Sequence, residues 1–444
     1  MLIRFAVENY KSFKQRQVFS MMAGQSIQHT DHLILMNDNR FLKSSFFFGA
    51  NASGKSNFVR AIDFMRRITL SGLNKIRYND RYFKIESKCK NKPGVFQADF
   101  FTNGKIYSYG FAINYISHKI EEEWLYRINP NNSEQCIFER DSQVTKHLKL
   151  SEKSELRFEI YCDDLKEDHL LLTDIANKNL NQSHEFSDFI DAYRWFEKIV
   201  VIYPGSHPRN RNAYFLNPNA DADSMVNMLH TFDTGIEGIV KARQPVEEAL
   251  AFLPTEIRKN VLDNVQQELF TQPYIKSKSS LEINGYQFEL SVENGEIMAE
   301  KIMLDHGNHS EPFEFAEESD GTKRLFDLIP LFNYGQRERI IIIDELDRSL
   351  HSKLTQEYIQ YFFHYTRNKP SQLICTTHDI NLLDLSILRK DEIWFVERAD
   401  DHSTKLYSLN DYKQRFDADV LHDYIIGRYG AIPCFQNDEW QVNG

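Results

Sequence analysis

The chain has 444 residues, of which 41% are hydrophobic and 13% aromatic, so it can fill a sizeable core and is not a disordered chain. Its net charge of −11 argues against indiscriminate binding to polyanions, and no apolar run is long enough to cross a bilayer. The five cysteines are scattered, odd in number and without metal-ligand pairing, which indicates reduced thiols. We therefore expect two structural units in a cytoplasmic protein without a membrane partner.

The first part of the chain predicts strands around one helix. Residues 2–9 alternate apolar and polar positions as in a half-buried strand, and Ser45–Phe48 form a short apolar strand that ends at Gly49. From Lys55 onward, apolar side chains recur at helical spacing. Further along, Asn103-Gly104 lies between two strand-like runs and predicts a hairpin turn.

The segment between that strand and that helix fits the phosphate-loop pattern G-x-x-x-x-G-K-[ST] at every fixed position. Its glycines free backbone N–H groups to wrap phosphates at a helix N-terminus, where the helix dipole favours negative charge. Lys55 is expected to reach the β- and γ-phosphates of ATP, and the Ser56 hydroxyl to ligate Mg²⁺. The residues expected to contact the nucleotide are Asn51, Ala52, Ser53, Gly54, Lys55 and Ser56.

The basic residues are concentrated in one stretch. From Lys55 to Lys92 the chain carries 11 Lys and Arg against 3 acidic residues, a local balance of 11 − 3 = +8. Such a stretch is either a solvated face or a surface for nucleic acid or an acidic partner, and the sequence leaves both open.

The middle of the chain is less informative. No heptad pattern persists, so a long coiled-coil arm is not expected. Helices are predicted near 168–179, 186–196 and 246–270, and turns at Asn284-Gly285 and Asn294-Gly295. We expect an α/β fold with a mixed sheet from residues 1–140 and 301–444, and a largely helical insertion or lid from 141–300.

The C-terminal part carries a second chemical motif. Four isoleucines, 340–343, predict a buried parallel strand that ends in Asp344 and Glu345, and ligands of open α/β sheets bind at this end of the strands. Asp344 is placed to hold Mg²⁺ through water. Glu345 is placed to orient and polarise the water that attacks the γ-phosphate. Together with the phosphate loop, the pair predicts ATP hydrolysis.

Two weaker signals flank this strand. Glu318–Arg324 open a helix 22 positions before it (340 − 318), and the Ser319 hydroxyl and the Gly321 N–H could present donors to a γ-phosphate or simply cap the helix. His378 follows the apolar strand Gln372–Cys375 and two threonines, where a γ-phosphate-sensing role is favoured over a structural one.

This combination resembles prokaryotic ABC-type ATPases related to the SMC proteins and to the ATPase domains of the OLD family. Asn9–Phe13 is similar to their N-F-K-S-F stretch, Gly49–Asn57 to their G-x-N-x-x-G-K-S-N loop, and Glu318–Arg324 to their shortened signature. Asp344–His351 looks like their Walker B and D-loop run, and His378 matches their switch histidine. The resemblance implies an ABC-type P-loop ATPase head, and adds Asn57 to the nucleotide contacts.

The closing stretch Tyr424–Pro433 resembles a stand-alone anti-phage subgroup that includes RloA-like, AbiL-like and PARIS AriA-like ATPases, whose members work with a separately encoded nuclease or toxin. The resemblance implies a homodimer or larger homo-oligomer in which Ser319 and Gly321 of one protomer complete the ATP site of another. It also implies a glutamine in the Q-loop that contacts Mg²⁺. Gln97 is assigned to it because it lies in a strand-like segment after the phosphate-loop helix.

Three functions remain to be separated. The leading one is an ATP-driven sensor or scaffold that controls a partner effector, a nuclease or toxin, in anti-phage defence. A DNA-repair or chromosome-associated SMC-like clamp is supported by the basic stretch and disfavoured by the missing arms. A nuclease in its own right is disfavoured because only 66 residues follow His378 (444 − 378), too few for the nuclease domain of OLD proteins.

Overall fold

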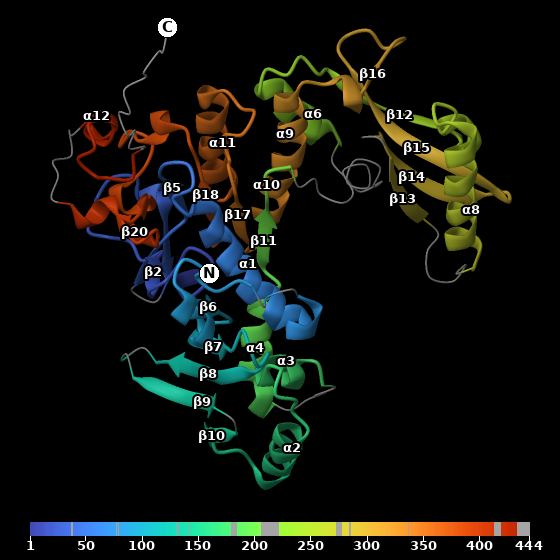
Figure 1. Cartoon of the computed structure of the whole chain (residues 1–444). Helices are drawn as coiled ribbons and strands as arrows, with labels where there is room; N and C mark the ends of the chain where they lie inside the picture. The colour runs from blue at the N-terminus through green and yellow to red at the C-terminus, as the bar shows by residue number, and fades with distance from the viewer. Residues whose placement is uncertain are drawn as a thin grey trace, which may run out of the picture. The chain divides into compact units, whose positions relative to one another are not determined.

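The computed structural model describes residues 1–36, 39–76, 78, 80–129, 131, 133–141, 143–178, 184–205, 222–271, 278–283, 286–335, 337–412 and 419–432 (Figure 1). The chain forms two compact units. The first unit is Met1–Pro204, Tyr334–Asp347 and Tyr358–Gly444, and the second unit is Gly205–Asn333 with Arg348–Glu357.

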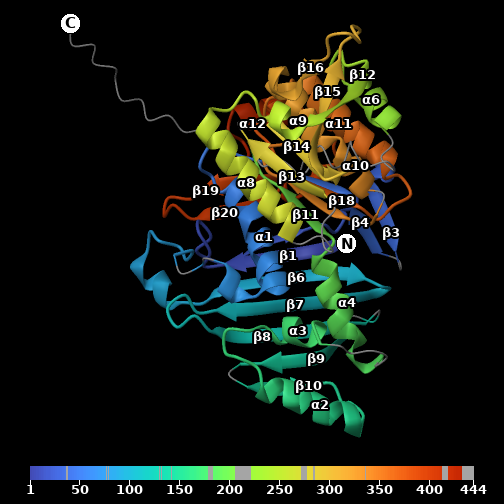
Figure 2. The same cartoon turned by 90° about the vertical axis from the view of Figure 1, so that its right-hand side faces the viewer.

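The first unit contains a seven-stranded antiparallel sheet in which the N-terminal strands β1 and β2 extend one edge of a later meander, β6 to β10. Figure 2 shows β6 to β9 lying side by side. Between β6 and β7, Asn103 and Gly104 have φ of 47° and 80°, so the predicted two-residue hairpin is confirmed. In sheet order the strands are β10 (Val144–His147), β9 (Glu134–Arg140), β8 (Ile120–Ile128), β7 (Lys105–Ile113), β6 (Gly94–Thr102), β1 (Leu2–Glu8) and β2 (Gln17–Ser20).

A six-stranded sheet in the same unit carries the chemical motifs. All neighbours are parallel except β19 and β20, so the expected mixed sheet of an α/β fold is confirmed. Every residue of β5, β17 and β18 is buried, which explains their near-continuous apolar sequences. In sheet order the strands are β11 (Ile199–Ile202), β17 (Ile340–Ile343), β18 (Gln372–Thr376), β5 (Ser44–Phe48), β19 (Ile393–Arg398) and β20 (Thr404–Ser408).

Helix α1 (Lys55–Ser71) joins the two sheets through an aromatic core. The ring of Phe58 lies 4.4 Å from that of Phe47 on β5 and 5.9 Å from that of Phe5 on β1, measured between centroids. All three side chains are almost fully buried, and each such ring stabilises the fold by about 1.5–3 kcal/mol. The helix that begins at the phosphate loop is therefore fixed against both sheets.

Residues 141–204 belong to the first unit and not to the expected insertion of 141–300. Their helices are α2 (Glu152–Asp163), α3 (Leu171–Ala176) and α4 (Ser187–Phe196). The buried carboxylate of Glu123 accepts hydrogen bonds from the N–H groups of Leu171 and Leu172 at the start of α3. On α4, Trp195 stacks on Phe100 of β6 at 4.1 Å between centroids. These long-range contacts leave no local signal at position 140, so the sequence cannot place the boundary.

The second unit contains a sheet as well as helices, where the sequence predicts mostly helix. Its strands are β12 (Gly238–Pro245), β15 (Glu296–Asp305), β14 (Tyr286–Glu293) and β13 (Lys278–Ile283), with β16 (Phe313–Glu314) beside β15. Its helices are α6 (Ala222–Thr231), α7 (Val246–Ala249), α8 (Thr255–Thr271) and α9 (Asp320–Leu328). The helix expected over 246–270 is interrupted before α8, where Pro254 precedes its first residue. The predicted Asn294-Gly295 turn is confirmed, with φ of 51° and 86°, whereas Asn284-Gly285 lies outside the described residues.

The remaining helices and strands of the described residues are β3 (Leu33–Met36), β4 (Asn39–Leu42), α10 (Pro330–Gly335), α11 (Ser352–Tyr365) and α12 (Val420–Ile425). Short 3₁₀ turns lie at Thr30–His32, Leu73–Lys75, Ser87–Asn91, His184–Phe186, Phe315–Glu317, Ile380–Leu382, Lys390–Glu392 and Leu409–Asp411. Within the described parts of the chain, no helix has both the length and the hydropathy that a membrane span requires. Cys89, Cys136, Cys162 and Cys375 are free thiols, and Cys434 lies outside the described residues.

Candidate nucleotide site

The phosphate loop connects β5 to α1 and needs glycine at both of its fixed glycine positions. Gly54 has a φ of +116°, and a Cβ there would lie 2.1 Å from the Thr404 hydroxyl oxygen. At Gly49 a Cβ would lie 2.2 Å from the backbone oxygen of Val396. Any side chain would therefore displace β19 and β20 from the loop. The loop ends at the N-terminus of α1, where the first N–H groups of a helix have no acceptor within the helix and suit an anionic ligand.

Residues from distant parts of the sequence hold this loop. The Ser12 hydroxyl oxygen accepts hydrogen bonds from Asn57 Nδ2 at 2.9 Å and from the Thr404 hydroxyl at 2.8 Å. The Thr404 hydroxyl also lies 2.8 Å from the Ser53 carbonyl oxygen. The Ala50 N–H donates to the Ala431 carbonyl oxygen at 2.9 Å. Sequence reasoning named Ser12 and Ala431 only within motifs and missed Thr404, because no local pattern marks contacts of this separation.

Lys55 is buried inside the loop, with 5% of its surface exposed. Its ammonium donates to the carbonyl oxygens of Gly49 at 2.6 Å and Ala50 at 3.2 Å. Burial lowers the pKa of Lys55 to about 8, and the carboxylates of Asp347, Asp344 and Glu345 act in the opposite direction. Because the pKa of Lys55 lies close to neutral pH, an anionic ligand such as a triphosphate would stabilise its charged form.

The predicted magnesium ligands Ser56 and Asp344 lie in direct contact. The Ser56 hydroxyl donates to Asp344 Oδ1 at 3.1 Å, and the Thr376 hydroxyl on β18 donates to the same oxygen at 2.7 Å. Asp344 is buried at the end of β17, where parallel pairing with β11 and β18 fixes its backbone. One hydroxyl and one carboxylate at the end of neighbouring strands are the kind of oxygen ligands that Mg²⁺ prefers.

Glu345 directly follows and adopts an unusual backbone conformation. Its φ is +54°, and its N–H donates to the Thr376 hydroxyl oxygen at 2.8 Å. A non-glycine residue in the left-handed region costs of order 1–3 kcal/mol and persists only where the surroundings impose it. The side chain is half-buried. The turn thus orients Glu345 differently from the strand that precedes it.

His378 follows β18 and is tied to the same turn through its backbone. The His378 N–H lies 3.1 Å from Oδ1 and 3.2 Å from Oδ2 of Asp347. Partial burial, followed by the charge of Lys55, lowers the pKa of His378 below its ordinary value, so the ring is neutral at pH 7. Asp347 was not singled out from the sequence, although its position three residues after Asp344 was the available signal.

Gln97 does not share a described contact with Ser56 or Asp344. It lies on β6 of the seven-stranded sheet, where its amide nitrogen donates to Asp99 Oδ1 at 3.1 Å and to the Ser108 hydroxyl at 3.0 Å. Its amide oxygen accepts a hydrogen bond from Arg16. These contacts give no support to Gln97 as a magnesium ligand.

The signature residues lie in the second unit. Ser319 is the N-cap of α9, and its hydroxyl oxygen accepts from the Thr322 N–H at 3.1 Å, as the capping interpretation predicts. A Cβ on Gly321 would lie 2.8 Å from the Ser349 carbonyl oxygen, so glycine is needed for this approach. Ser349 itself has a φ of +62°. The N-terminus of α9 and Ser349, which belong to the same unit, are thus packed together.

Residues 44–384, more than half of the chain, match a family described as "AAA domain, putative AbiEii toxin, Type IV TA system". The chain belongs to this AAA-domain family. The match begins at β5, runs through the phosphate loop, Asp344 and His378, and ends in the turn that follows them. No curated protein matches the chain significantly.

Solved SMC heads are similar to the chain over nearly their whole length. The SMC head domain from Thermotoga maritima has a TM-score of 0.40 and 12% identity, and covers 92% of this chain and 98% of its own. An Smc head bound to the C-winged helix domain of ScpA has a TM-score of 0.39, 13% identity, and coverage of 92% and 97%. An Smc head with an extended coiled coil, bound to the C-terminal domain of ScpA from Pyrococcus furiosus, has a TM-score of 0.35, 14% identity, and coverage of 92% and 96%.

The residues of this AAA-domain protein fit a magnesium nucleotide. The Ser53 hydroxyl is 98% buried in the phosphate loop and has no hydrogen-bond partner among the described residues. Beside the loop lies a pocket of about 720 Å³ that includes Ser12, the residue that also supports the loop. Lys11, Arg81 and Arg398 make its lining cationic, and Tyr82 adds an aromatic ring. The pocket is large enough for the nucleoside part of a nucleotide.

Proposed function

We propose that this protein binds ATP with Mg²⁺ in the phosphate loop and hydrolyses it. The observation that carries the proposal is the contact between Ser56 and Asp344 at the end of the phosphate loop. In the same loop Lys55 is buried, and burial lowers its pKa to about 8. The loop N–H groups and Lys55 would hold the β- and γ-phosphates. Ser56 would bind Mg²⁺ directly, and Asp344 would hold it through water. The metal would supply charge neutralisation of the phosphates.

Glu345 and His378 are proposed to carry the chemistry. Glu345 directly follows Asp344 and adopts the left-handed conformation, and its carboxylate would orient the attacking water and accept its proton. His378 is neutral at pH 7, so its ring would accept or donate one hydrogen bond near the γ-phosphate and would add no positive charge.

The pocket beside the loop is proposed to take the sugar and base of ATP. Ser12 belongs both to the hydrogen bonds that support the loop and to the lining of the pocket, so the two are continuous. Tyr82 offers a face for stacking, and Arg81 and Arg398 offer cations for phosphate or ribose oxygens.

The site is proposed to be completed by a second copy of the chain. Ser319 and Gly321 stand at the N-terminus of α9, where a helix dipole and backbone N–H groups favour an anion. Among the described residues the Ser319 hydroxyl contacts only Thr322 of its own helix, so it could turn to a γ-phosphate supplied by another protomer. ATP between two protomers would then stabilise the assembled state because it binds that state more tightly than the separated one.

The wider role proposed is control of a separately encoded nuclease or toxin in anti-phage defence. The support is the family description, which names a toxin of a toxin–antitoxin system, together with the resemblance of the sequence to stand-alone anti-phage ATPases. Assembly and release driven by ATP would give two states that an effector can distinguish.

Removal of the Lys55 ammonium tests the nucleotide site. Lys55→Ala should lower ATP affinity by at least about 100-fold, since a buried charge-assisted contact to phosphate is lost. Lys90→Ala, an exposed lysine of the same basic stretch, serves as the matched control and should bind like wild type. Calorimetric titration with ATP and Mg²⁺ measures both. Micromolar affinity retained by Lys55→Ala would overturn the nucleotide-site assignment.

The effector role needs a separate test. The product of a neighbouring nuclease or toxin gene, co-expressed with this chain, should co-purify with wild type and be released or retained according to whether ATP is present. A permease as the neighbouring gene product would contradict the role. The purified chain should also be assayed for nuclease activity with Mg²⁺ or Mn²⁺. Activity that persists in every ATP-site variant would show that the protein is itself a nuclease.

A further inference from the structure

Three side chains with metal-binding donors gather at the turn that precedes β3. His29, Asp31 and His32 each offer one donor atom, and these atoms lie within 4.8 Å of one another. The 3₁₀ turn Thr30–His32 creates this proximity, because residues three apart share a face of such a turn. His29 enters the turn with a φ of +47° and is half-buried, Asp31 is exposed and His32 is buried. The cluster belongs to no part of the proposed nucleotide site.

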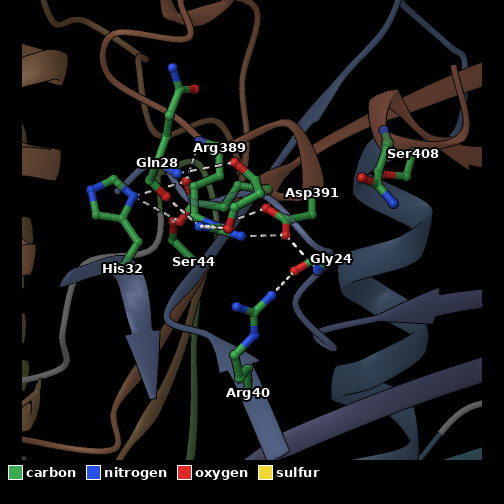
Figure 3. Close-up of polar contacts among 11 residues, drawn as sticks. Gly24, Gln28, His32, Arg40, Ser44, Arg389, Asp391 and Ser408 are labelled. Atoms are coloured by element: carbon green, nitrogen blue, oxygen red, sulfur yellow. Dashed lines mark hydrogen bonds and ion pairs between the residues drawn. The ribbon is translucent and has the colours of Figure 1, made fainter. Parts of the chain in front are cut away.

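Both histidines are already held by their other ring nitrogen. His32 Nδ1 lies 3.1 Å and 3.0 Å from the two carboxylate oxygens of Glu392, and His29 Nε2 lies 2.9 Å from the carbonyl oxygen of Leu385. Because a carboxylate and a carbonyl only accept hydrogen bonds, these two nitrogens carry the protons in the neutral rings. The lone pairs are then on Nε2 of His32 and Nδ1 of His29. Figure 3 shows the second nitrogen of His32 on the side turned away from Glu392.

A buried polar network fixes the orientation of His32. Glu392 is fully buried and accepts further hydrogen bonds from the Ser44 hydroxyl at 2.7 Å and from the Arg389 N–H at 2.7 Å (Figure 3). Arg389 in turn makes a two-pronged ion pair with Asp391, at 2.9 Å and 2.8 Å. The ring of His32 is also stacked on Phe363. A histidine whose second nitrogen donates to a carboxylate is the usual arrangement around protein-bound zinc, since it fixes the ring and raises the basicity of the ligand nitrogen.

We infer that His29, Asp31 and His32 form a binding site for a divalent transition-metal ion of the zinc class, with water as the fourth ligand. Two imidazoles and one carboxylate favour Zn²⁺ over Mg²⁺, which prefers oxygen ligands. Bond lengths of about 2.0–2.1 Å place tetrahedral donors roughly 3.4 Å apart, so the donors must converge slightly. The exposed Asp31 side chain is free to rotate for this purpose.

One neighbouring cation, Lys43, lowers the affinity of this site for a metal ion. Lys43 lies close enough to Asp31 to interact with it, and its ammonium donates to the carbonyl oxygens of Thr366 at 3.0 Å and Arg367 at 2.8 Å. Asp31 is the one carboxylate among the proposed ligands, and the charge of Lys43 partly offsets it, so we expect moderate affinity.

Zinc and cobalt titrations of the whole chain test the site. Wild type should bind one Zn²⁺ in competition with a chromogenic chelator, and bound Co²⁺ should show the visible absorption of a tetrahedral complex. His29→Ala should lower the affinity by at least about 100-fold, Asp31→Asn by roughly tenfold, and Glu392→Gln by about 10–100-fold. His118→Ala is the matched control, because His118 is an exposed histidine that also has a positive φ, at 62°.

The outcomes separate the site from background binding by the other histidines and cysteines. A loss of the strongest binding step in His29→Ala, with His118→Ala equal to wild type and both variants melting like wild type, supports the site. Equal zinc affinity in His29→Ala and wild type, or no stoichiometric uptake by wild type, overturns it. If Glu392→Gln fails to fold, the comparison of His29→Ala with His118→Ala still decides.

Discussion

The phosphate-loop region and the signature region are built in opposite ways. The loop is held by residues far away in sequence, since Thr404 bonds to Ser12 across 392 positions and to Ser53 across 351. The hydrogen bonds of the signature residue Ser319 among the described residues are local, from its hydroxyl to Thr322 and from its carbonyl oxygen to the N–H of Lys323. One region is pre-organised by the whole first unit, whereas the other is a helix N-terminus with its own cap. This difference is what a site completed by a second protomer requires.

The largest effect is expected from Glu345, the residue proposed to act as the base beside the phosphate loop. Glu345→Gln keeps the shape of the side chain but removes the base, so the rate of ATP hydrolysis should fall by about 100-fold or more while ATP still binds. A single-turnover assay and a binding titration measure the two quantities. Hydrolysis at the wild-type rate would contradict the role of Glu345.

The pH dependence of ATP binding sharpens the account of Lys55. Its lowered pKa of about 8 means that the free protein loses this charge between pH 7 and pH 9, whereas a bound triphosphate raises the pKa again. ATP binding must therefore take up a proton at high pH, and affinity should fall by roughly tenfold from pH 7 to pH 9. Calorimetry at both values, in two buffers of different ionisation enthalpy, measures the affinity and the proton uptake. Equal affinities at the two values would show that Lys55 is fully charged without ligand.

The same shift has a stability consequence of known sign. The pKa of Lys55 is lower in the folded protein than its ordinary value of 10.5, so between about 8 and 10.5 the unfolded chain binds more protons. This group alone therefore destabilises the fold at neutral pH, and that cost is relieved as pH rises through this window.

Substitution of Gly321 by alanine tests the contribution of the signature residues to ATP hydrolysis. Gly321→Ala places a Cβ 2.8 Å from the Ser349 carbonyl oxygen, so the backbone at Ser349 must shift. Steady-state ATP hydrolysis should fall by about tenfold, with binding of ATP to the loop unchanged, because the signature is proposed to act only in the assembled state. Gly238→Ala in the same unit meets only ordinary contacts at 3.6 Å and is the control. Equal hydrolysis by the two variants would remove Gly321 from the site.

The smallest effect concerns the long-range support of the loop. Thr404→Val removes the hydroxyl that bonds to Ser12 and to the Ser53 carbonyl oxygen, which costs about 1–2 kcal/mol of stability. ATP affinity should fall by a few-fold because the loop is less pre-organised. Thr404→Ser, which keeps the hydroxyl, should bind ATP like wild type, and thermal unfolding reports the stability of both. Unchanged stability and affinity in Thr404→Val would mean that the loop holds its shape locally.

The sequence predicts those features that depend on short segments. A pattern of a few neighbouring residues is enough to recognise each of three features: the phosphate loop, the buried strand before Asp344 and the N-cap at Ser319. The contacts of Thr404, Ala431 and Asp347 could not, because pairing of distant strands creates them. Gln97 shows the same limit, since its strand was predicted but not the Arg16, Asp99 and Ser108 side chains that surround its amide.

Domain organisation was the least predictable feature. Residues 141–204 pack on the first sheet through Glu123 and Trp195, and β12 pairs with β15 from about 60 positions later, so neither boundary has a local marker. The cluster at His29, Asp31 and His32 was also missed. Its spacing is unremarkable in sequence, and only Glu392 and Leu385, more than 350 positions away, distinguish it.

The most direct test of a shared ATP site mixes two inactive variants. Lys55→Ala disables the loop and leaves the signature intact, whereas Ser319→Arg disables the signature and leaves the loop intact. In a mixed dimer one of the two sites combines an intact loop with an intact signature. About half of the dimers in an equimolar mixture are mixed, so the mixture should recover roughly a quarter of the wild-type rate of ATP hydrolysis. A mixture no more active than the average of the two variants would show that each chain completes its own site.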